Sequence, residues 1–172
     1  MRGLAVICVL SLVVSACAGA TSRTARPLEV RHGDDGVLAC VPLDEGEALE
    51  IDAAGVSAIT VDGRTPPKPW TIVLDSGQPP RRLAPGDCLA YGSLPDGYTE
   101  AIPPARLEED WPYSFAIRSP EWGRRGTRNH AVDFCVRRSG GRWLSVAMPE
   151  GPAAITVQTC SSLLDAASAG SP

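Results

Sequence analysis

Short apolar runs alternate along the chain with clusters of proline, glycine and aspartate, and this spacing predicts many short strands. In the run from Tyr113 to Ile117, every second side chain is large and apolar, so these side chains fall on one face of a strand. The predicted strands are Leu28–Arg31, Gly36–Pro42, Ala48–Ala53, Ala58–Val61, Trp70–Asp75, Cys88–Tyr91, Tyr113–Arg118, Ala131–Arg137, Trp143–Ala147 and Ala154–Thr159.

Helices are expected to be few, because 17 glycines and 16 prolines interrupt the chain. Only Ala105–Trp111 and Ser161–Ala167 predict short helical turns. The segment Ser139-Gly140-Gly141 lies between two predicted strands and is typical of a hairpin turn, in which glycine supplies a positive φ. Together these patterns predict an all-β fold, a small antiparallel β-sandwich in preference to a barrel, with the immunoglobulin-like sandwich as one form of it.

The first residues have the pattern of a targeting signal. Arg2 precedes an apolar run from Leu4 to Val14, which is too short for a membrane-spanning helix of about 20 residues. The segment Val14-Ser15-Ala16-Cys17 resembles the lipobox of bacterial lipoproteins, in which the cysteine receives the lipid. An ordinary secretory signal with an incidental cysteine is the alternative. The resemblance implies that acyl chains on Cys17 anchor the protein, and that Ala18 in place of aspartate directs it to the outer membrane, facing the periplasm.

The chain then divides into a signal peptide (1–16), a lipidated tether (17–27), one β-sandwich domain (28–163) and a flexible tail (164–172). Removal of the signal takes away one of the 16 basic residues, Arg2, so the mature chain has 15 basic and 20 acidic residues and a net charge near −5. This acidic balance gives no indication of nucleic acid as a partner.

Cysteine usage agrees with export to an oxidising compartment. Because Cys8 leaves with the signal and the lipobox cysteine carries the lipid, four of the six cysteines remain in the domain, namely Cys40, Cys88, Cys135 and Cys160. An even number in an exported domain predicts two disulfides, for which three pairings exist. The sequential pairing, Cys40 with Cys88 and Cys135 with Cys160, closes the shortest loops and is preferred, with each bond contributing about 3–4 kcal/mol.

Catalytic and metal-binding motifs are missing from the sequence, so we expect neither enzymatic activity nor a cofactor or metal. The chain has no Gly-x-Ser-x-Gly elbow, phosphate loop or His-Glu-x-x-His helix. His32 and His130 are interpreted as surface histidines. The pair Asp34-Asp35 lacks the further oxygen donors of a calcium loop, and no Cys-x-x-Cys supports a zinc site.

Candidate partner-binding residues lie in two polar segments. Trp122, Arg124 and Arg125 belong to a loop rich in glycine and charge, and tryptophan and arginine are enriched at interface hot spots. The acidic cluster Glu108-Glu109-Asp110 ends a long predicted surface loop, Ser93–Asp110, and loops often carry function. Ordinary loop packing and a plain solvated connection are the respective alternatives.

The segments around the cysteines carry a family resemblance. They are Gly36–Pro42, Leu83–Gly92, Tyr113–Ile117 and Ala131–Val136, in this order behind the lipobox. This order resembles the type VI secretion immunity lipoproteins of the bacterial periplasm. The resemblance implies a binding protein that covers the active site of a toxin injected by a neighbouring cell and performs no chemistry itself. An acidic domain would suit a basic toxin face and could speed their encounter.

Two other functions fit the same features. One is a structural or assembly accessory of the envelope that binds another membrane component or cell-wall material. The other is an inhibitor of host lysozyme, since such inhibitors are also small lipidated β domains. The expected partners are therefore a membrane, through the lipid, and a protein such as a toxin, with no nucleic acid and no small-molecule substrate indicated.

Overall fold

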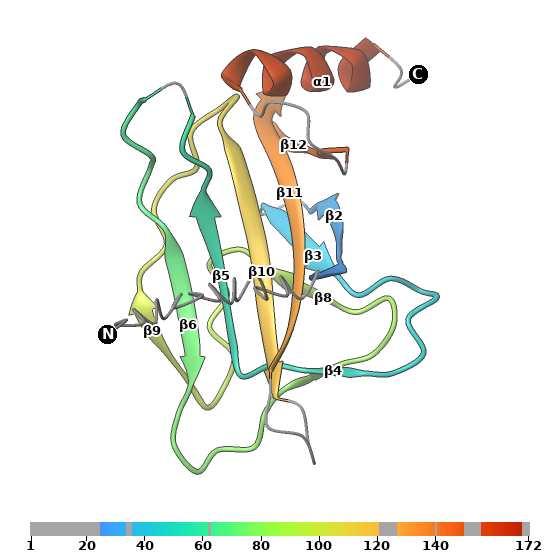
Figure 1. Ribbon diagram of the computed structural model, residues 1–172, viewed down its shortest axis with the longest axis vertical. Coiled ribbons are helices and arrows are strands. Elements are labelled where there is room, and N and C mark those ends of the chain that lie inside the picture. The colour runs from blue at the N-terminus through green and yellow to red at the C-terminus, as the bar shows by residue number, and fades with distance from the viewer. Residues whose placement is uncertain are drawn as a thin grey trace, which may run out of the picture.

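The computed structural model describes residues 25–33, 36–61, 63–120, 127–139, 141–149 and 156–169. Figure 1 shows its long strands side by side, with the helix lying across one end of them. The elements are β1 (Arg26–Pro27), β2 (Glu29–His32), β3 (Val37–Cys40), β4 (Leu49–Glu50), β5 (Ala53–Ala58), β6 (Trp70–Leu74), β7 (Arg82–Leu83), β8 (Cys88–Ala90), β9 (Tyr98–Ile102), β10 (Pro112–Pro120), β11 (Thr127–Ser139), β12 (Arg142–Ala147) and α1 (Val157–Ala169).

Seven of these strands form the main sheet, in the order β1-β11-β10-β5-β6-β9, with β12 also paired to β11. A second sheet has the order β2-β3-β8, and β4 pairs with β7. The pairs are antiparallel except for β1 with β11, which is parallel. The predicted all-β, disulfide-stapled fold is therefore confirmed. Its division into seven and three strands differs from the four and three of an immunoglobulin constant domain.

The two larger sheets contribute to one hydrophobic core. Trp70 of β6 is fully buried, and the rings of Tyr91 and Phe115 pack against it edge-on. Tyr113 and Phe134 stack on the neighbouring strands β10 and β11. Such aromatic pairs contribute about 0.5–1.5 kcal/mol each beyond the burial of their area. Aromatic residues on alternating positions of β10 thus fix which face of the main sheet points inward.

A second, smaller core lies on the opposite face of β11. Phe134 and Val136 belong to the main core, whereas Cys135 between them belongs to a separate cluster with Cys160 and Leu164 of α1. Because successive side chains of a strand point to opposite faces, α1 covers the outward face of the main sheet at β11 and β12 (Figure 1). The end of β11 is consequently buried on both sides.

Several predicted strands are present with shifted ends, but the prediction of a strand at Ala58–Val61 is wrong. The strand is β5, which ends at Ala58, and Ile59 begins a connection. The small residues of β5 give a weak apolar signal, so the larger side chains beyond it attracted the prediction. The short strand β9 lies inside the predicted loop Ser93–Asp110, where it forms the edge of the main sheet against β6.

The predicted helical turn at Ala105–Trp111 is also wrong. Leu107 and Trp111 are both buried in the main core, and the segment that joins them is irregular. Asp110 has a φ of 60°, which a right-handed helix does not allow. Tertiary burial of two large side chains therefore determined the path of this segment, in preference to its local helical propensity.

The boundaries at both ends of the domain differ from the prediction. β1 lies within the predicted tether 17–27, so the end of that segment belongs to the main sheet. The predicted turn Ser161–Ala167 is the middle of α1, which starts within the predicted strand Ala154–Thr159 and continues to Ala169, into the predicted tail. The helix is stable there because Thr156 caps it, accepting a hydrogen bond from Thr159 N at 3.0 Å, and because Leu164 is fully buried.

Candidate functional site

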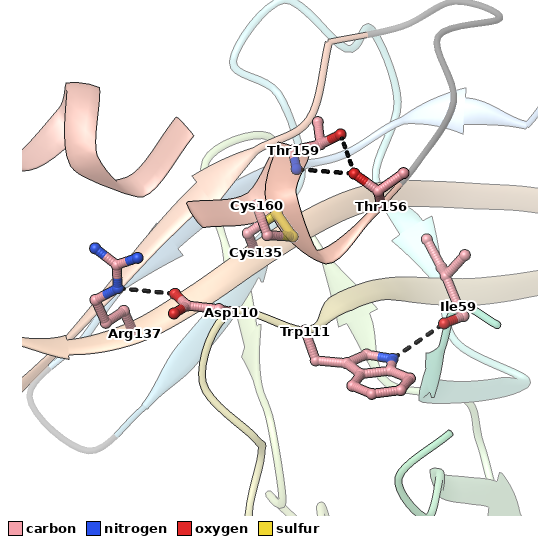
Figure 2. Close-up of a disulfide and its surroundings, with 8 residues drawn as sticks. All are labelled: Ile59, Asp110, Trp111, Cys135, Arg137, Thr156, Thr159 and Cys160. Carbon is pink, nitrogen blue, oxygen red and sulfur yellow. Dashed lines mark hydrogen bonds and ion pairs between the residues drawn. A yellow bond between two sulfur atoms is a disulfide. The ribbon is translucent and has the colours of Figure 1, made fainter. Parts of the chain in front are cut away.

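The two disulfides pair as preferred from the sequence, Cys40 with Cys88 and Cys135 with Cys160. The first joins directly opposite residues of β3 and β8, with a Cα–Cα distance of 4.0 Å. The second joins β11 to α1 with a Cα–Cα distance of 5.4 Å (Figure 2). One bond therefore staples strands within the smaller sheet, and the other fastens the only helix of the described residues to the main sheet.

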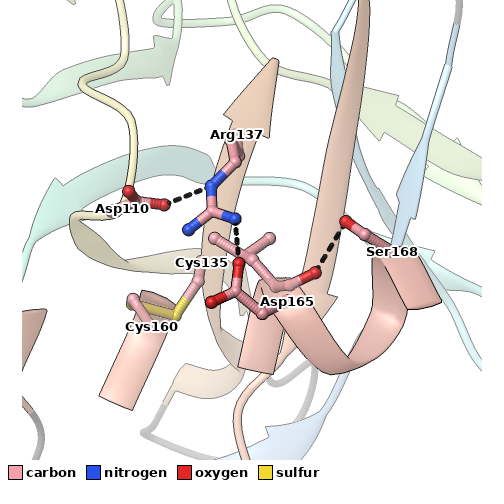
Figure 3. A network of polar contacts seen from close by, with 7 residues as sticks. Asp110, Cys135, Arg137, Cys160, Asp165 and Ser168 are labelled. Carbon is pink, nitrogen blue, oxygen red and sulfur yellow. Dashed lines mark hydrogen bonds and ion pairs between the residues drawn. A yellow bond between two sulfur atoms is a disulfide. The ribbon is translucent and has the colours of Figure 1, made fainter. Parts of the chain in front are cut away.

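An ion-pair network reinforces the attachment of α1. Arg137 lies two residues after Cys135 on β11, on the same face, and its guanidinium contacts Asp110 and Asp165 (Figure 3). The Nε–Oδ1 distance to Asp110 is 2.8 Å. Hydrogen bonds to Asp110 and then to Asp165 raise the pKa of Arg137. We call the disulfide Cys135–Cys160 together with this network the helix clasp.

The acidic cluster predicted to bind a partner is split by the structure. Asp110 belongs to the helix clasp, so its carboxylate is already engaged within the chain. Glu108 and Glu109 are exposed, and their carboxylates make no hydrogen bond or ion pair with another described residue. The backbone N–H of Glu108 donates to Tyr113 Oη at 2.7 Å, and burial raises the pKa of Tyr113 to about 12. The loop is thus fixed, and two of its three carboxylates are available to a partner.

The same end of this loop is also anchored by Trp111. Its indole Nε1 donates to Ile59 O at 3.0 Å (Figure 2), and the guanidinium of Arg64 lies 4.6 Å from its ring centroid. The remaining predicted binding residues, Trp122, Arg124 and Arg125, lie outside the described residues, as does the predicted lipidation site Cys17. The structure therefore describes only the acidic part of the predicted surface, and partner binding by these residues stays a prediction.

Another acidic stretch lies between β3 and β5. Four of its five carboxylates each contact an arginine of a different strand. The pairs are Glu45 with Arg26, Glu47 with Arg128, Glu50 with Arg82 and Asp52 with Arg118. Solvent-exposed pairs of this kind contribute about 0–1 kcal/mol each to the stability of the fold. Their main effect is that each carboxylate neutralises the charge of one strand arginine. Much of the arginine of the chain is therefore unavailable to a partner.

A hollow lies on the outward face of the main sheet. It has a volume of about 260 Å³ and is lined by β5, β6, β10 and β11. Its floor consists of small side chains, and Arg118 and Asn129 lie at one end. We call this surface the open face; its small residues are Ala53, Gly55, Ser57, Thr71 and Ala116.

The register explains why the open face is flat. Thr71, Gly55, Ala116 and Ala131 pair in a row across four strands, so no large side chain rises above the backbone there. A Cβ atom at Gly55 would lie 2.5 Å from the carbonyl oxygen of Trp70, which makes glycine necessary at this position. The alternation of small residues along β5 is the sequence signal that could have indicated this surface.

The two histidines have opposite environments. His32 is exposed, as predicted. The prediction that His130 lies on the surface is wrong, because its side chain is only 3% exposed and points into the protein from β11. Burial lowers the pKa of His130. The burial of His130 could not be predicted from the sequence, because a single polar residue among apolar ones does not indicate which face of the strand is covered.

The described ranges contain neither a group of metal-ligating side chains nor a helix that could span a membrane. Within them no three histidine, cysteine, aspartate or glutamate side chains gather into a metal-binding group. No helix among them is long and apolar enough to cross a membrane.

Comparison with other proteins adds no assignment to this geometry. The chain matches no protein-family model, no curated protein and no solved structure.

Proposed function

We propose that this chain is an exported, lipid-anchored binding protein that protects its cell by occluding a toxin delivered by type VI secretion. The observation that carries the binding function is the open face, because a flat sheet surface with small side chains lets another protein approach the backbone closely. Its hollow of about 260 Å³ is shallow enough to be filled by side chains of a partner. Occlusion needs such a surface and no catalytic group of its own.

Export and anchoring are supported by the cysteines. Two disulfides are typical of proteins that fold in an oxidising compartment. The lipobox-like segment ends at Cys17, and the first strand of the described residues starts at Arg26. The connecting residues 18–25 span roughly 30 Å when fully extended. The domain would therefore stay close to the membrane that holds its lipid.

The partner is expected to present a basic surface. After removal of the signal the chain has five more acidic than basic residues, from 20 acidic against 15 basic. The arginines of the strands are largely engaged in ion pairs, whereas the carboxylates of Glu108, Glu109 and Asp133 have no partner among the described residues. Complementary charge of this kind mainly raises the association rate.

A competition experiment tests the immunity function. The gene is deleted, and the strain is challenged by sibling cells with or without an active type VI secretion system. We expect the deletion strain to be killed only by the secreting siblings, and plasmid-borne wild-type protein to restore survival. Unchanged survival against every secreting sibling would count against immunity, and an envelope defect without any sibling present would favour the accessory function.

Complementation with variants tests the open face. Ala116→Arg places a long charged side chain on the floor of the hollow, at an exposed position where the fold tolerates it. Ser76→Arg, in the exposed turn after β6, is the matched control outside the open face. We expect the first variant to be stable but unable to protect, and the second to protect normally. Equal protection by both variants would exclude the open face as the binding surface.

Anchoring is tested separately with Cys17→Ser. This variant is expected to appear in the soluble periplasmic fraction, whereas the wild type stays with the membranes, since acyl chains supply the attachment. Membrane recovery of Cys17→Ser would contradict lipidation at this residue.

A further inference from the structure

The N-terminal end of the domain is held to β11 by a short pairing. β1 pairs in parallel with His130 and Ala131, and the backbone N–H of Leu28 then donates to Ala131 O at 3.0 Å. On its other side β11 pairs with β10 at nine successive positions. Any change that disturbs this part of β11 would therefore displace β1 before it displaces β10.

His130 lies at this junction, opposite Arg26 of β1 and Ile117 of β10. Its side chain is 3% exposed, and its Nδ1 is buried without a hydrogen-bond partner among the described residues. A neutral imidazole tolerates such a site far better than an imidazolium, because a buried charge without a partner is costly. The fold therefore accepts one protonation state of this side chain and opposes the other.

The charged groups around the imidazole come from three parts of the chain. Burial lowers the pKa of His130, the carboxylate of Glu45 raises it, and the guanidinium groups of Arg26 and Arg128 lower it. Glu45, between β3 and β4, is itself paired with Arg26. A protonated His130 would thus repel Arg26 and compete with it for the same carboxylate.

We propose that His130 is a pH-sensitive latch, and that its protonation in mildly acidic solution releases β1 and Leu28 from β11. β1 is the strand that separates, because it pairs with β11 at only two positions. It also carries Arg26, whose guanidinium repels a protonated His130. Once β1 has separated, water reaches the imidazolium of His130, and the carboxylate of Glu45 can pair with His130 in place of Arg26. The rest of the main sheet keeps its ladder.

The consequence for the anchored protein rests on the proposed lipidation of Cys17. Release of residues 26–28 would add roughly 10 Å to the reach of the tether. The domain would then sit farther from the membrane in acidic surroundings than at neutral pH. The latch itself does not depend on the lipid, so it can be tested in the unlipidated chain.

Hydrogen exchange on the full chain carrying Cys17→Ser tests the latch with an internal reference. Leu28 N and Met148 N both donate to carbonyl oxygens of β11, those of Ala131 and Asp133. As the pH falls from about 7.5 to about 5.5, across the usual titration range of histidine, the protection of Leu28 should decrease. One linked proton allows a decrease of up to about tenfold per pH unit, and the protection of Met148, after correction for the intrinsic exchange rate, should stay constant.

Two variants separate the latch from general loosening. His130→Leu cannot be protonated, so it should keep Leu28 equally protected at both pH values, whereas His32→Ala should behave as the wild type. Constant Leu28 protection in the wild type would overturn the proposal. So would an equal loss in His130→Leu, or a parallel loss at Met148, which would indicate global unfolding.

A third variant tests the direction of the effect without altering the imidazole. Arg128 lowers the pKa of His130, so Arg128→Gln should move the midpoint of Leu28 release to higher pH. A midpoint that stays or moves to lower pH would contradict the latch. None of these results depends on membrane fractionation, so a failed anchor and a failed latch are distinguishable.

Discussion

The two ends of the domain attach to the same strand by different means. The N-terminal end is held near His130 and Ala131 by a two-residue strand and the burial of Leu28. The C-terminal helix is held at Cys135 and Arg137 by the helix clasp, which includes a covalent bond. The two attachments lie a few residues apart on β11. Only the second one contains a covalent bond, so only α1 stays attached to β11 at every pH.

This difference indicates which end of the domain can separate from β11 while the rest stays folded. A disulfide keeps α1 against the sheet whatever the pH, so the surface at the end of β11 is permanently covered. β1 pairs with β11 at only two positions, and such short pairings are typical of segments that open without global unfolding. An exported chain anchored at its N-terminus would therefore flex at the attachment that bears its tether.

The largest expected effect comes from removing the covalent part of the helix clasp. In Cys135→Ser/Cys160→Ser, a loop closed over 25 residues is lost, so we expect the free energy of unfolding to fall by about 3–4 kcal/mol. Urea denaturation measures this change, and hydrogen exchange should show α1 amides losing protection. Unchanged protection of α1 would show that packing and ion pairs alone hold the helix.

Truncation of one leucine at each end compares the two attachments directly. Leu28 and Leu164 are both buried, with exposed fractions of 4% and 0%. Leu28→Ala and Leu164→Ala should each lower the free energy of unfolding by about 2–4 kcal/mol. With the disulfides oxidised, only Leu28→Ala should also accelerate exchange locally at its end of the domain, because α1 remains tethered. If the α1 amides of Leu164→Ala exchanged as fast as the residue 28 amide of Leu28→Ala, the two attachments would not differ in local stability.

The ion pairs of the helix clasp should matter less than the disulfide. The side chain of Asp165 is 69% exposed and that of Asp110 31% exposed, so water screens the first pair more strongly. We expect Asp110→Asn to cost about 1 kcal/mol and Asp165→Asn less than about 0.5 kcal/mol. Thermal unfolding at low and high salt checks this order, which an equal cost for both variants would contradict.

The smallest effect at neutral pH concerns His130, because its contribution emerges only on acidification. Its pKa is lowered in the folded state, so the unfolded chain binds the proton more tightly. Stability is therefore complete above the unfolded pKa of about 6.5 and decreases as the pH falls below it toward the folded pKa. Urea denaturation between about pH 7.5 and 5.5 should show this decrease in the wild type and a smaller one in His130→Leu. Identical pH profiles would assign the decrease to other groups.

Parts of the candidate surfaces could be anticipated from particular residues. The polar cluster Glu108-Glu109-Asp110 indicated an accessible loop, and two of its members are indeed exposed. Asp110 differs because its partner, Arg137, is 27 residues away in sequence, and only folding brings the two together. The open face was not anticipated, because its small residues come from three strands whose register no local pattern specifies.

By itself, the sequence predicted the all-β class and two disulfides, with the sequential pairing preferred because it closes the shorter loops, and the structure contains all of these. Export to an oxidising compartment was also inferred from the sequence and stays a prediction. Those features depend on local alternation, on turn residues and on loop length, which are all properties of neighbouring positions. Only the tertiary structure decided that Ala105–Trp111 is irregular, that α1 replaces a tail, and that His130 is buried. Each of these depends on which distant strand or helix covers a given face, and the free energy of that burial exceeds local preference.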